Sequence, residues 1–151
     1  MKKSALLALV AFILLACNVQ KNASTTAEKN SLEEFQLIYK ANTRGFFQEI
    51  KIKDHNVYIS NDRNGTNNQN PVKIADKDWQ NITELVSKVN LDGLAELKSP
   101  TEKRFYDGAA IANLSITKND QTYQSSDFDN GFPPKEIEEL VKKITSYAVK
   151  E

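Results

Sequence analysis

The sequence predicts an α+β fold, an antiparallel sheet of about five strands with two amphipathic helices packed on one face. Three observations support this prediction. Apolar and polar residues alternate over several short segments that turn residues separate, as in antiparallel hairpins. Two longer segments carry apolar residues at helical spacing. Runs of strands precede each helix, an order typical of α+β proteins. The 151 residues suffice for one domain.

The first three strands are expected between residues 35 and 60. Apolar residues occupy alternate positions in 35–40 and again in 46–53. The polar triplet 54–56 predicts a turn because Asp and Asn side chains stabilise turns. Residues 57–60 then pair back as a hairpin, and the polar stretch 61–70 predicts an exposed loop.

The first helix is expected over about residues 77–90, with Asp76 as its N-cap. Residues 72–75 before it form either a short strand or an extended lead-in. After the helix, 91–97 predicts a short apolar turn and 99–108 a loop that begins at Ser99-Pro100. The apolar residues at helical spacing are Trp79, Ile82, Leu85, Val86 and Val89.

The second half repeats the order of strands followed by a helix. Residues 110–116 carry an apolar face, 118–120 a turn, and 121–128 a returning strand. A helix follows Pro133-Pro134, with proline in its first turn, where no N–H donor is required. Segments 82–89 and 137–144 are similar, which indicates either two duplicated hairpin–helix units or convergence of two amphipathic helices. The apolar residues of this second helix are Ile137, Leu140, Val141, Ile144 and Tyr147.

The N-terminus predicts a secretory signal. Lys2 and Lys3 precede twelve apolar residues, 5–16, which as a helix reach about 18 Å and are too short to cross a hydrocarbon core of about 30 Å. Residues 14–17, Leu-Leu-Ala-Cys, resemble the lipobox of bacterial lipoproteins. That resemblance implies cleavage after a signal peptide of residues 1–16 and lipid on Cys17. An ordinary signal peptide followed by a chance cysteine is the alternative.

Cleavage would change the composition of the chain. Residues 17–30 are polar and predict a lipidated flexible tether, and residues 31–151 form the single α+β domain. The full chain has 20 basic and 20 acidic side chains, so loss of Lys2 and Lys3 leaves a net charge of −2. This balance gives no reason to expect nucleic acid as a partner. The only cysteine, Cys17, would carry lipid, which leaves no thiol for a disulfide or a nucleophile.

The residue after the lipidated cysteine indicates a destination. Asn18 resembles the class that enteric bacteria release from the inner membrane. We therefore expect anchoring in the outer membrane, with the domain facing the periplasm rather than the cell surface. The partners expected are the membrane, through lipid on Cys17, and an envelope protein.

A candidate ion or ligand site lies near the last strand. Asp127, Asp129 and Gly131 resemble the opening of a calcium-binding loop, and Asp107 is expected close to them. The glycine comes one position early and Pro133-Pro134 stiffen the segment, so a strand-to-helix turn is the favoured interpretation. No cofactor is expected. The single histidine, His55, could sense pH, bind a metal or be simply exposed in its turn, and exposure is the favoured interpretation.

A candidate partner contact lies in the loop 99–108, where Arg104, Phe105 and Tyr106 are consecutive. Arg and aromatic residues are enriched at binding hot spots. The favoured alternative is that Phe105 and Tyr106 cap the edge of the core beneath the loop. No catalytic set is recognisable, since the only histidine lies in a hairpin turn. A Ser–Lys pair or two carboxylates remain open for a hydrolase.

The whole pattern resembles small bacterial lipoproteins in which a lipobox leads to a compact α+β domain. These domains end in a strand, a turn of the form F-D-x-G-x-P-P and an I-x-x-L-V helix. The corresponding residues are 128–134 and Ile137, Leu140 and Val141. The resemblance implies localisation and fold but no activity. We expect a non-catalytic binding or accessory module of the cell envelope; the alternatives are a small-ligand or calcium-binding lipoprotein and, third, a hydrolase.

Overall fold

A seven-stranded antiparallel sheet with two helices forms the domain in the computed structural model, which describes residues 34–64 and 70–148. The strand order is β4-β3-β2-β1-β5-β6, and β7 pairs with β5 beside β6. The predicted α+β class is confirmed, with slightly more strands than the five expected. The signal peptide and tether predicted for residues 1–30 lie outside the described residues.

The first four strands form a meander. They are β1 (Phe35–Asn42), β2 (Phe47–Lys53), β3 (Asn56–Ser60) and β4 (Val72–Lys73), each antiparallel to the one before it. Asp54 and His55 connect β2 to β3 with φ values of 51° and 59°. Positive φ at both central residues is the geometry of a type I′ hairpin turn, which matches the right-handed twist of the strands.

The second half of the sheet contains β5 (Ile111–Lys118), β6 (Gln121–Gln124) and β7 (Phe128–Asp129). One continuous strand was expected over 121–128, and this expectation is wrong because the segment bulges after Gln124. The pairs Ala112–Phe128 and Ser115–Gln124 flank the bulge. Between them lie two residues of β5, 113–114, but three residues of the opposite segment, 125–127. The extra residue interrupts the ladder and separates β7 from β6.

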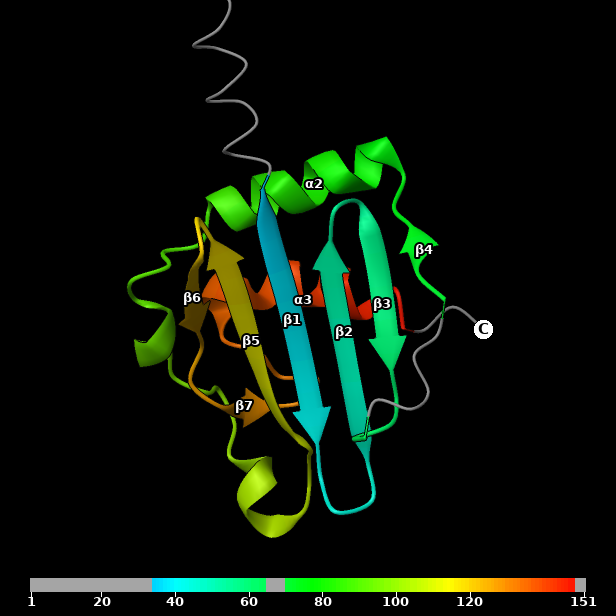
Figure 1. Ribbon diagram of the computed structural model, residues 1–151. Helices are drawn as coiled ribbons and strands as arrows, with labels where there is room; N and C mark the ends of the chain where they lie inside the picture. Colours follow the sequence, from blue (N-terminus) through cyan, green and yellow to red (C-terminus); the bar gives the residue numbers. More distant parts are fainter. Residues whose placement is uncertain (1–33, 65–69, 149–151) are drawn as a thin grey trace, which may run out of the picture. The chain divides into compact units, whose positions relative to one another are not determined.

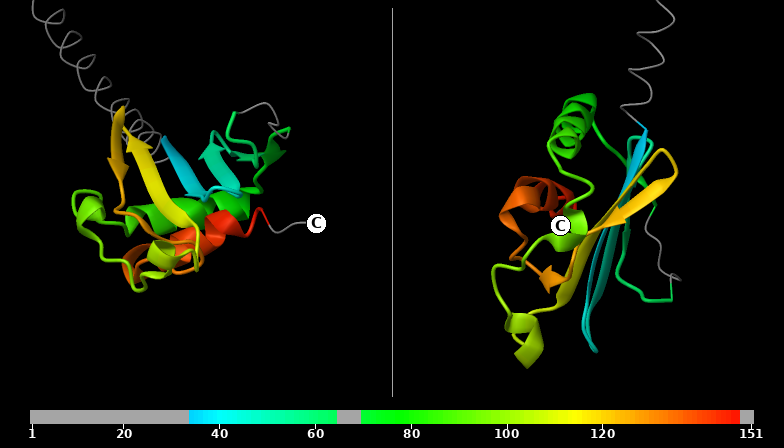
Figure 2. Two further views of the ribbon diagram at one scale, coloured as in Figure 1. Left: turned by 90° about the horizontal axis from the view of Figure 1, so that it is seen from below. Right: turned by 90° about the vertical axis from the view of Figure 1, so that its left-hand side faces the viewer.

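Both helices cover the same face of the sheet (Figure 2). They are α2 (Asp76–Ser87) and α3 (Glu138–Thr145), and Figure 1 shows them behind the sheet. No other described helix covers the front face. Alternate residues of β1 and β5 point into this interface and are buried. The largest fully buried side chains are Leu37, Tyr39, Ile50, Ile52, Ile74, Ile82, Leu94, Leu114, Ile116, Phe128, Ile137 and Leu140.

The helix ends differ slightly from the prediction. Ala75, rather than Asp76, occupies the N-cap position of α2, and its carbonyl accepts the first helical hydrogen bond from the Trp79 amide at 2.9 Å. Asp76 is instead an acidic residue of the first turn, where a carboxylate interacts favourably with the helix dipole. The helix ends at Ser87, three residues before Asn90.

Three short 3₁₀ helices complete the domain. They are η1 (Leu94–Glu96), η2 (Lys103–Tyr106) and η3 (Lys135–Ile137). The first confirms the apolar turn expected over 91–97, and the second lies where only a loop was expected. In the residues that the structure describes, no helix has the length and hydropathy needed to cross a membrane. Strands β1–β4 lead to α2, and strands β5–β7 lead to α3. Duplication of a hairpin–helix unit stays a prediction.

Candidate functional site

Exposed apolar side chains gather at one end of the sheet. Of the six large hydrophobic residues that are exposed in the described ranges, all but Val72 belong to segments that meet there. The register brings them together, since Ile111 pairs with Asn42 at the end of β1 and with Asp129 of β7. We call this set the apolar end: Phe46, Phe105, Tyr106, Ile111 and Phe132.

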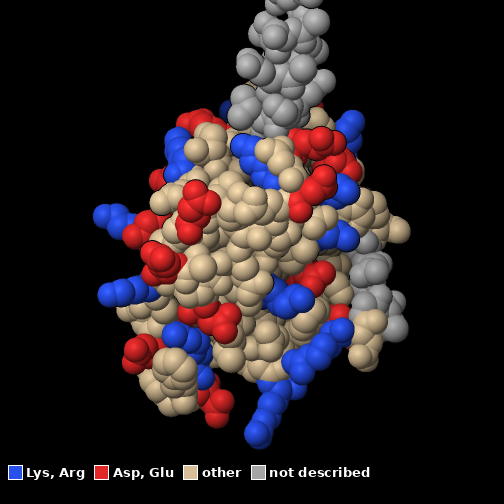
Figure 3. All heavy atoms as spheres, turned by 60° about the vertical axis from the view of Figure 1, so that its left-hand side comes forward, with Lys and Arg blue, Asp and Glu red and all other residues tan. Residues whose placement is uncertain are grey.

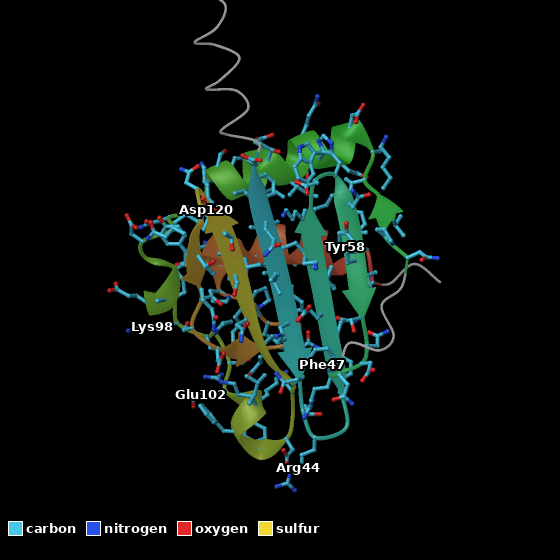
Figure 4. The ribbon with its side chains drawn as sticks, viewed as in Figure 1. Arg44, Phe47, Tyr58, Lys98, Glu102 and Asp120 are labelled. Carbon is cyan, nitrogen blue, oxygen red and sulfur yellow. The ribbon has the colours of Figure 1, made fainter. Side chains whose placement is uncertain are left out.

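The two most exposed members of the apolar end are Phe105 and Tyr106 of η2, with 72% and 71% of their surface accessible. The favoured expectation that they cap the edge of the core is therefore wrong. Figure 1 shows η2 as the coil at the lower end of the domain, beyond β7, and Figure 4 places Glu102 beside it and Arg44 at the neighbouring β1–β2 turn.

A buried carboxylate holds η2 in place. Asp129 has no accessible surface, and its Oδ2 accepts hydrogen bonds from the backbone N–H of Lys103 at 2.6 Å and from the hydroxyl of Thr101. Its Oδ1 accepts from the backbone N–H of Arg104 at 3.0 Å and from Nη1 of the same residue at 3.1 Å. Four donors from one loop therefore converge on one side chain of β7.

These contacts set the electrostatics of Asp129. Burial raises the pKa of this carboxyl, but the hydrogen bonds from Thr101, Arg104 and Lys103 outweigh that effect and lower the pKa to about 2. Asp129 is thus ionised at neutral pH, and the Arg104 guanidinium balances its charge. Such a pair is costly to break from one side because the remaining charge stays buried.

The expected role of Arg104 as an exposed contact is corrected by this geometry. Only 13% of its side chain is accessible, and the guanidinium points inward to Asp129. Its Nη1 also donates to the hydroxyl of Ser99 at 3.1 Å and to the carbonyl of Thr101 at 2.9 Å. The guanidinium carbon lies 4.3 Å from the centroid of the Phe105 ring, so Arg104 supports that ring from the protein side.

The end of η2 fixes the position of Tyr106. Asp107 adopts a left-handed conformation with φ of 59°, and the N–H of Gly108 donates to the carbonyl of Lys103 at 2.9 Å. A Cβ on Gly108 would lie only 3.1 Å from Cε2 of Tyr106. The absence of a side chain at this glycine therefore allows the Tyr106 ring to rest against the turn.

The opposite side of the apolar end is held by the turn after β7. Tyr39, fully buried in β1, donates its hydroxyl proton to Oδ1 of Asn130 at 2.6 Å, and burial raises the pKa of the phenol to about 12. Gly131 provides the positive φ of 86° that this turn needs. The ammonium of Lys103 lies 3.7 Å from the centroid of the Phe132 ring, which joins this turn to η2.

The three aspartates proposed as an ion site have different environments. Asp129 is fully engaged by η2, whereas Asp127 is exposed and accepts one hydrogen bond from Nδ2 of Asn113 at 3.2 Å. Asp107 is exposed at the end of η2. Within residues 34–64 and 70–148, no group of three or more His, Cys, Asp or Glu side chains is arranged to hold a metal ion. Calcium binding stays a prediction that this geometry does not favour.

His55 lies at the other end of the sheet, in the β2–β3 turn. Its imidazole meets the Trp79 indole edge to face at 4.2 Å between ring centroids, and the indole stacks on Phe35 at 5.0 Å. The backbone carbonyl of His55 accepts a hydrogen bond from the N–H of Ile74 at 2.7 Å. The single histidine therefore packs against the start of α2, a contact that its polar sequence neighbours did not indicate.

Among the hollows on the described domain, three lie away from the apolar end. Their volumes are about 260, 360 and 210 Å³, and neither Phe105 nor Tyr106 lines any of them. The first lies beside β3 and β4, with Val57, Ile74 and Tyr147 among its walls. Side chains of both signs are interspersed over most of the face in Figure 3. The apolar end is thus distinguished by exposure of aromatic rings on a projecting turn.

Comparison of the chain with protein-family models, with curated protein sequences and with solved structures found no match.

Proposed function

We propose that this chain is a bacterial lipoprotein. It is anchored to the outer membrane through lipid on Cys17, and its domain faces the periplasm. In this proposal the domain is a non-catalytic binding or accessory module that acts on an envelope protein. The charged segment, the twelve apolar residues and the position of Cys17 support the anchor. Two or three acyl chains suffice for stable anchoring.

The exposure of Phe105 and Tyr106 is the observation that carries the binding role. Aromatic side chains contribute most at the centres of protein interfaces, and large exposed apolar patches mark interaction sites. The apolar end also lies away from the point where the described chain begins. The described chain begins just before β1, and the apolar end lies at the other end of that strand, which spans about 26 Å.

The experiment is metabolic labelling with palmitate in the native envelope, comparing the parent chain with Cys17→Ala. We expect label on the parent alone, because only the Cys17 thiol can take the diacylglycerol. The parent is then recovered from solubilised envelopes with a stoichiometric protein partner. Equal labelling of both chains would contradict the anchor, and recovery of the parent without a partner would contradict the binding role.

A further inference from the structure

We propose that the apolar end is a rigid wedge that inserts Phe105 and Tyr106 into an apolar cleft on a folded envelope protein. This inference rests on the proposed function and adds the shape and chemistry of the partner's site. The first observation behind it is shape. Figure 2 shows η2 projecting from the domain, and the hollows described above do not include its aromatic residues. A small ligand needs a concave site on the protein that binds it. Two highly exposed rings on a projecting turn form a convex surface, which fits a partner that supplies the concavity.

The second observation is the rigidity of the support. Two of the four hydrogen bonds to Asp129 come from the backbone N–H groups of Lys103 and Arg104 and fix the backbone directly before the two rings. The other two come from the Thr101 hydroxyl and the Arg104 guanidinium. The Arg104 guanidinium lies against the Phe105 ring, and Gly108 leaves room for the Tyr106 ring. Binding therefore loses little conformational entropy at these side chains, which is the advantage of a preorganised contact.

The third observation is the apolar area available. A large aromatic side chain buries 150–250 Å², so two rings with about 70% of their surface accessible can bury about 250 Å². A standard interface buries about 800 Å² on each partner. Phe105 and Tyr106 can thus form the centre of such an interface, and the half-exposed Phe46, Ile111 and Phe132 lie around it.

The fourth observation is the charge beside the rings. Asp129 neutralises Arg104, while Lys103 lies over Phe132. Glu102 and Asp107, which flank η2, are both exposed carboxylates. Arg44, which is also exposed, lies at the neighbouring β1–β2 turn (Figure 4), so acidic and basic side chains balance at this end. An anionic bilayer attracts clusters of Lys and Arg, and among the described residues no such cluster surrounds the rings. The balance of charge favours a protein cleft that is apolar at its base, with an affinity that changes little with salt.

The test is photocrosslinking of the full chain in its native envelope. Phe105, Tyr106 and, as control, Val72 are each replaced by p-benzoylphenylalanine in separate chains. Val72 is the one other large hydrophobic residue exposed in the described ranges, and it lies in β4 away from η2 (Figure 1). We expect one protein adduct from positions 105 and 106 and none from 72. The adduct should persist in high salt, with the crosslinked residues lining an apolar cleft of the partner.

The contradicting outcomes separate the two proposals. Absence of a protein adduct from both 105 and 106 would overturn the binding role of the apolar end as well as the wedge. A protein adduct that maps to an extended segment or a convex surface would overturn the wedge alone. Adducts with phospholipid would assign the apolar end to a bilayer and overturn the wedge. Equal adducts from position 72 would show that the contact is not specific to this end.

Discussion

Asp129 shows how one residue determines the local structure of the apolar end. Its carboxylate is fully buried, yet four donors satisfy it, so the cost of burying the charge is offset by short charge-assisted hydrogen bonds. Asp127, two residues earlier, precedes β7 and is exposed, and its carboxylate accepts a hydrogen bond from Nδ2 of Asn113. The two aspartates therefore form a natural pair for comparison.

Replacement of Asp129 by Asn should lower the free energy of unfolding at neutral pH by about 3 kcal/mol, because the Arg104 guanidinium loses its buried counter-charge. Urea denaturation measures this change. Asp127→Asn is the control and should remain within about 0.5 kcal/mol of the parent. A change of that small size for Asp129→Asn would contradict the anchoring role.

The same residue predicts a dependence on pH. The pKa of Asp129 is lowered to about 2 in the folded state, so its contribution is present above the ordinary aspartate pKa of about 4. That contribution, about 2 kcal/mol, is lost as the pH falls toward 2. The difference in stability between the parent and Asp129→Asn should therefore shrink over this range. A difference that stays constant from pH 4 to pH 2 would contradict the lowered pKa.

The bulge between β6 and β7 is the element that brings Asp129 to η2. Without the extra residue at 125–127, the strand would continue in the register of β6, and the residues after it would exchange faces of the sheet. Ser125, which is buried, repairs the interrupted ladder. Its Oγ accepts from the N–H of Leu114 at 3.0 Å, and its own N–H donates to the Leu114 carbonyl at 2.9 Å.

Ser125→Ala should lower the free energy of unfolding by about 1–2 kcal/mol, because the buried Leu114 N–H loses the Ser125 hydroxyl as its acceptor. Ser115→Ala is the matched control on the neighbouring strand, where the hydroxyl makes an exposed contact of 3.5 Å with Gln124. The control should change stability by less than about 0.5 kcal/mol. Equal effects of the two substitutions would contradict the repair role of Ser125.

At the scale of the whole molecule, periodic patterns predicted most of the fold. The α+β class, the hairpins and both helices follow from apolar spacing, which directly reports burial. The bulge was not predictable in this way, because the apolar alternation over 121–128 is too weak for Ser125 and Ser126 to stand out as an interruption. The helix start was misplaced by one residue because Asp76 has the composition of an N-cap but lies in the first turn.

The candidate site was only partly predictable. The sequence singled out Arg104, Phe105, Tyr106 and Asp129. It assigned the aspartate to a strand-to-helix turn, with an ion site as the alternative, and the rings to the edge of the core, with a partner contact as the alternative. The contact between Asp129 and Arg104 joins residues 25 positions apart, and local spacing carries no signal for it. Once the carboxylate and the guanidinium pair, the loop closes on itself, and the two aromatic side chains after Arg104 are left facing solvent.

Phe105 and Tyr106 are expected to serve binding rather than packing. The free energy of unfolding of the double variant Phe105→Ala/Tyr106→Ala, measured by urea denaturation, distinguishes these roles. Side chains that are about 70% exposed contribute little to the core, so we expect a value within about 0.5 kcal/mol of the parent. A loss of about 3 kcal/mol or more, as for a buried phenylalanine, would contradict it.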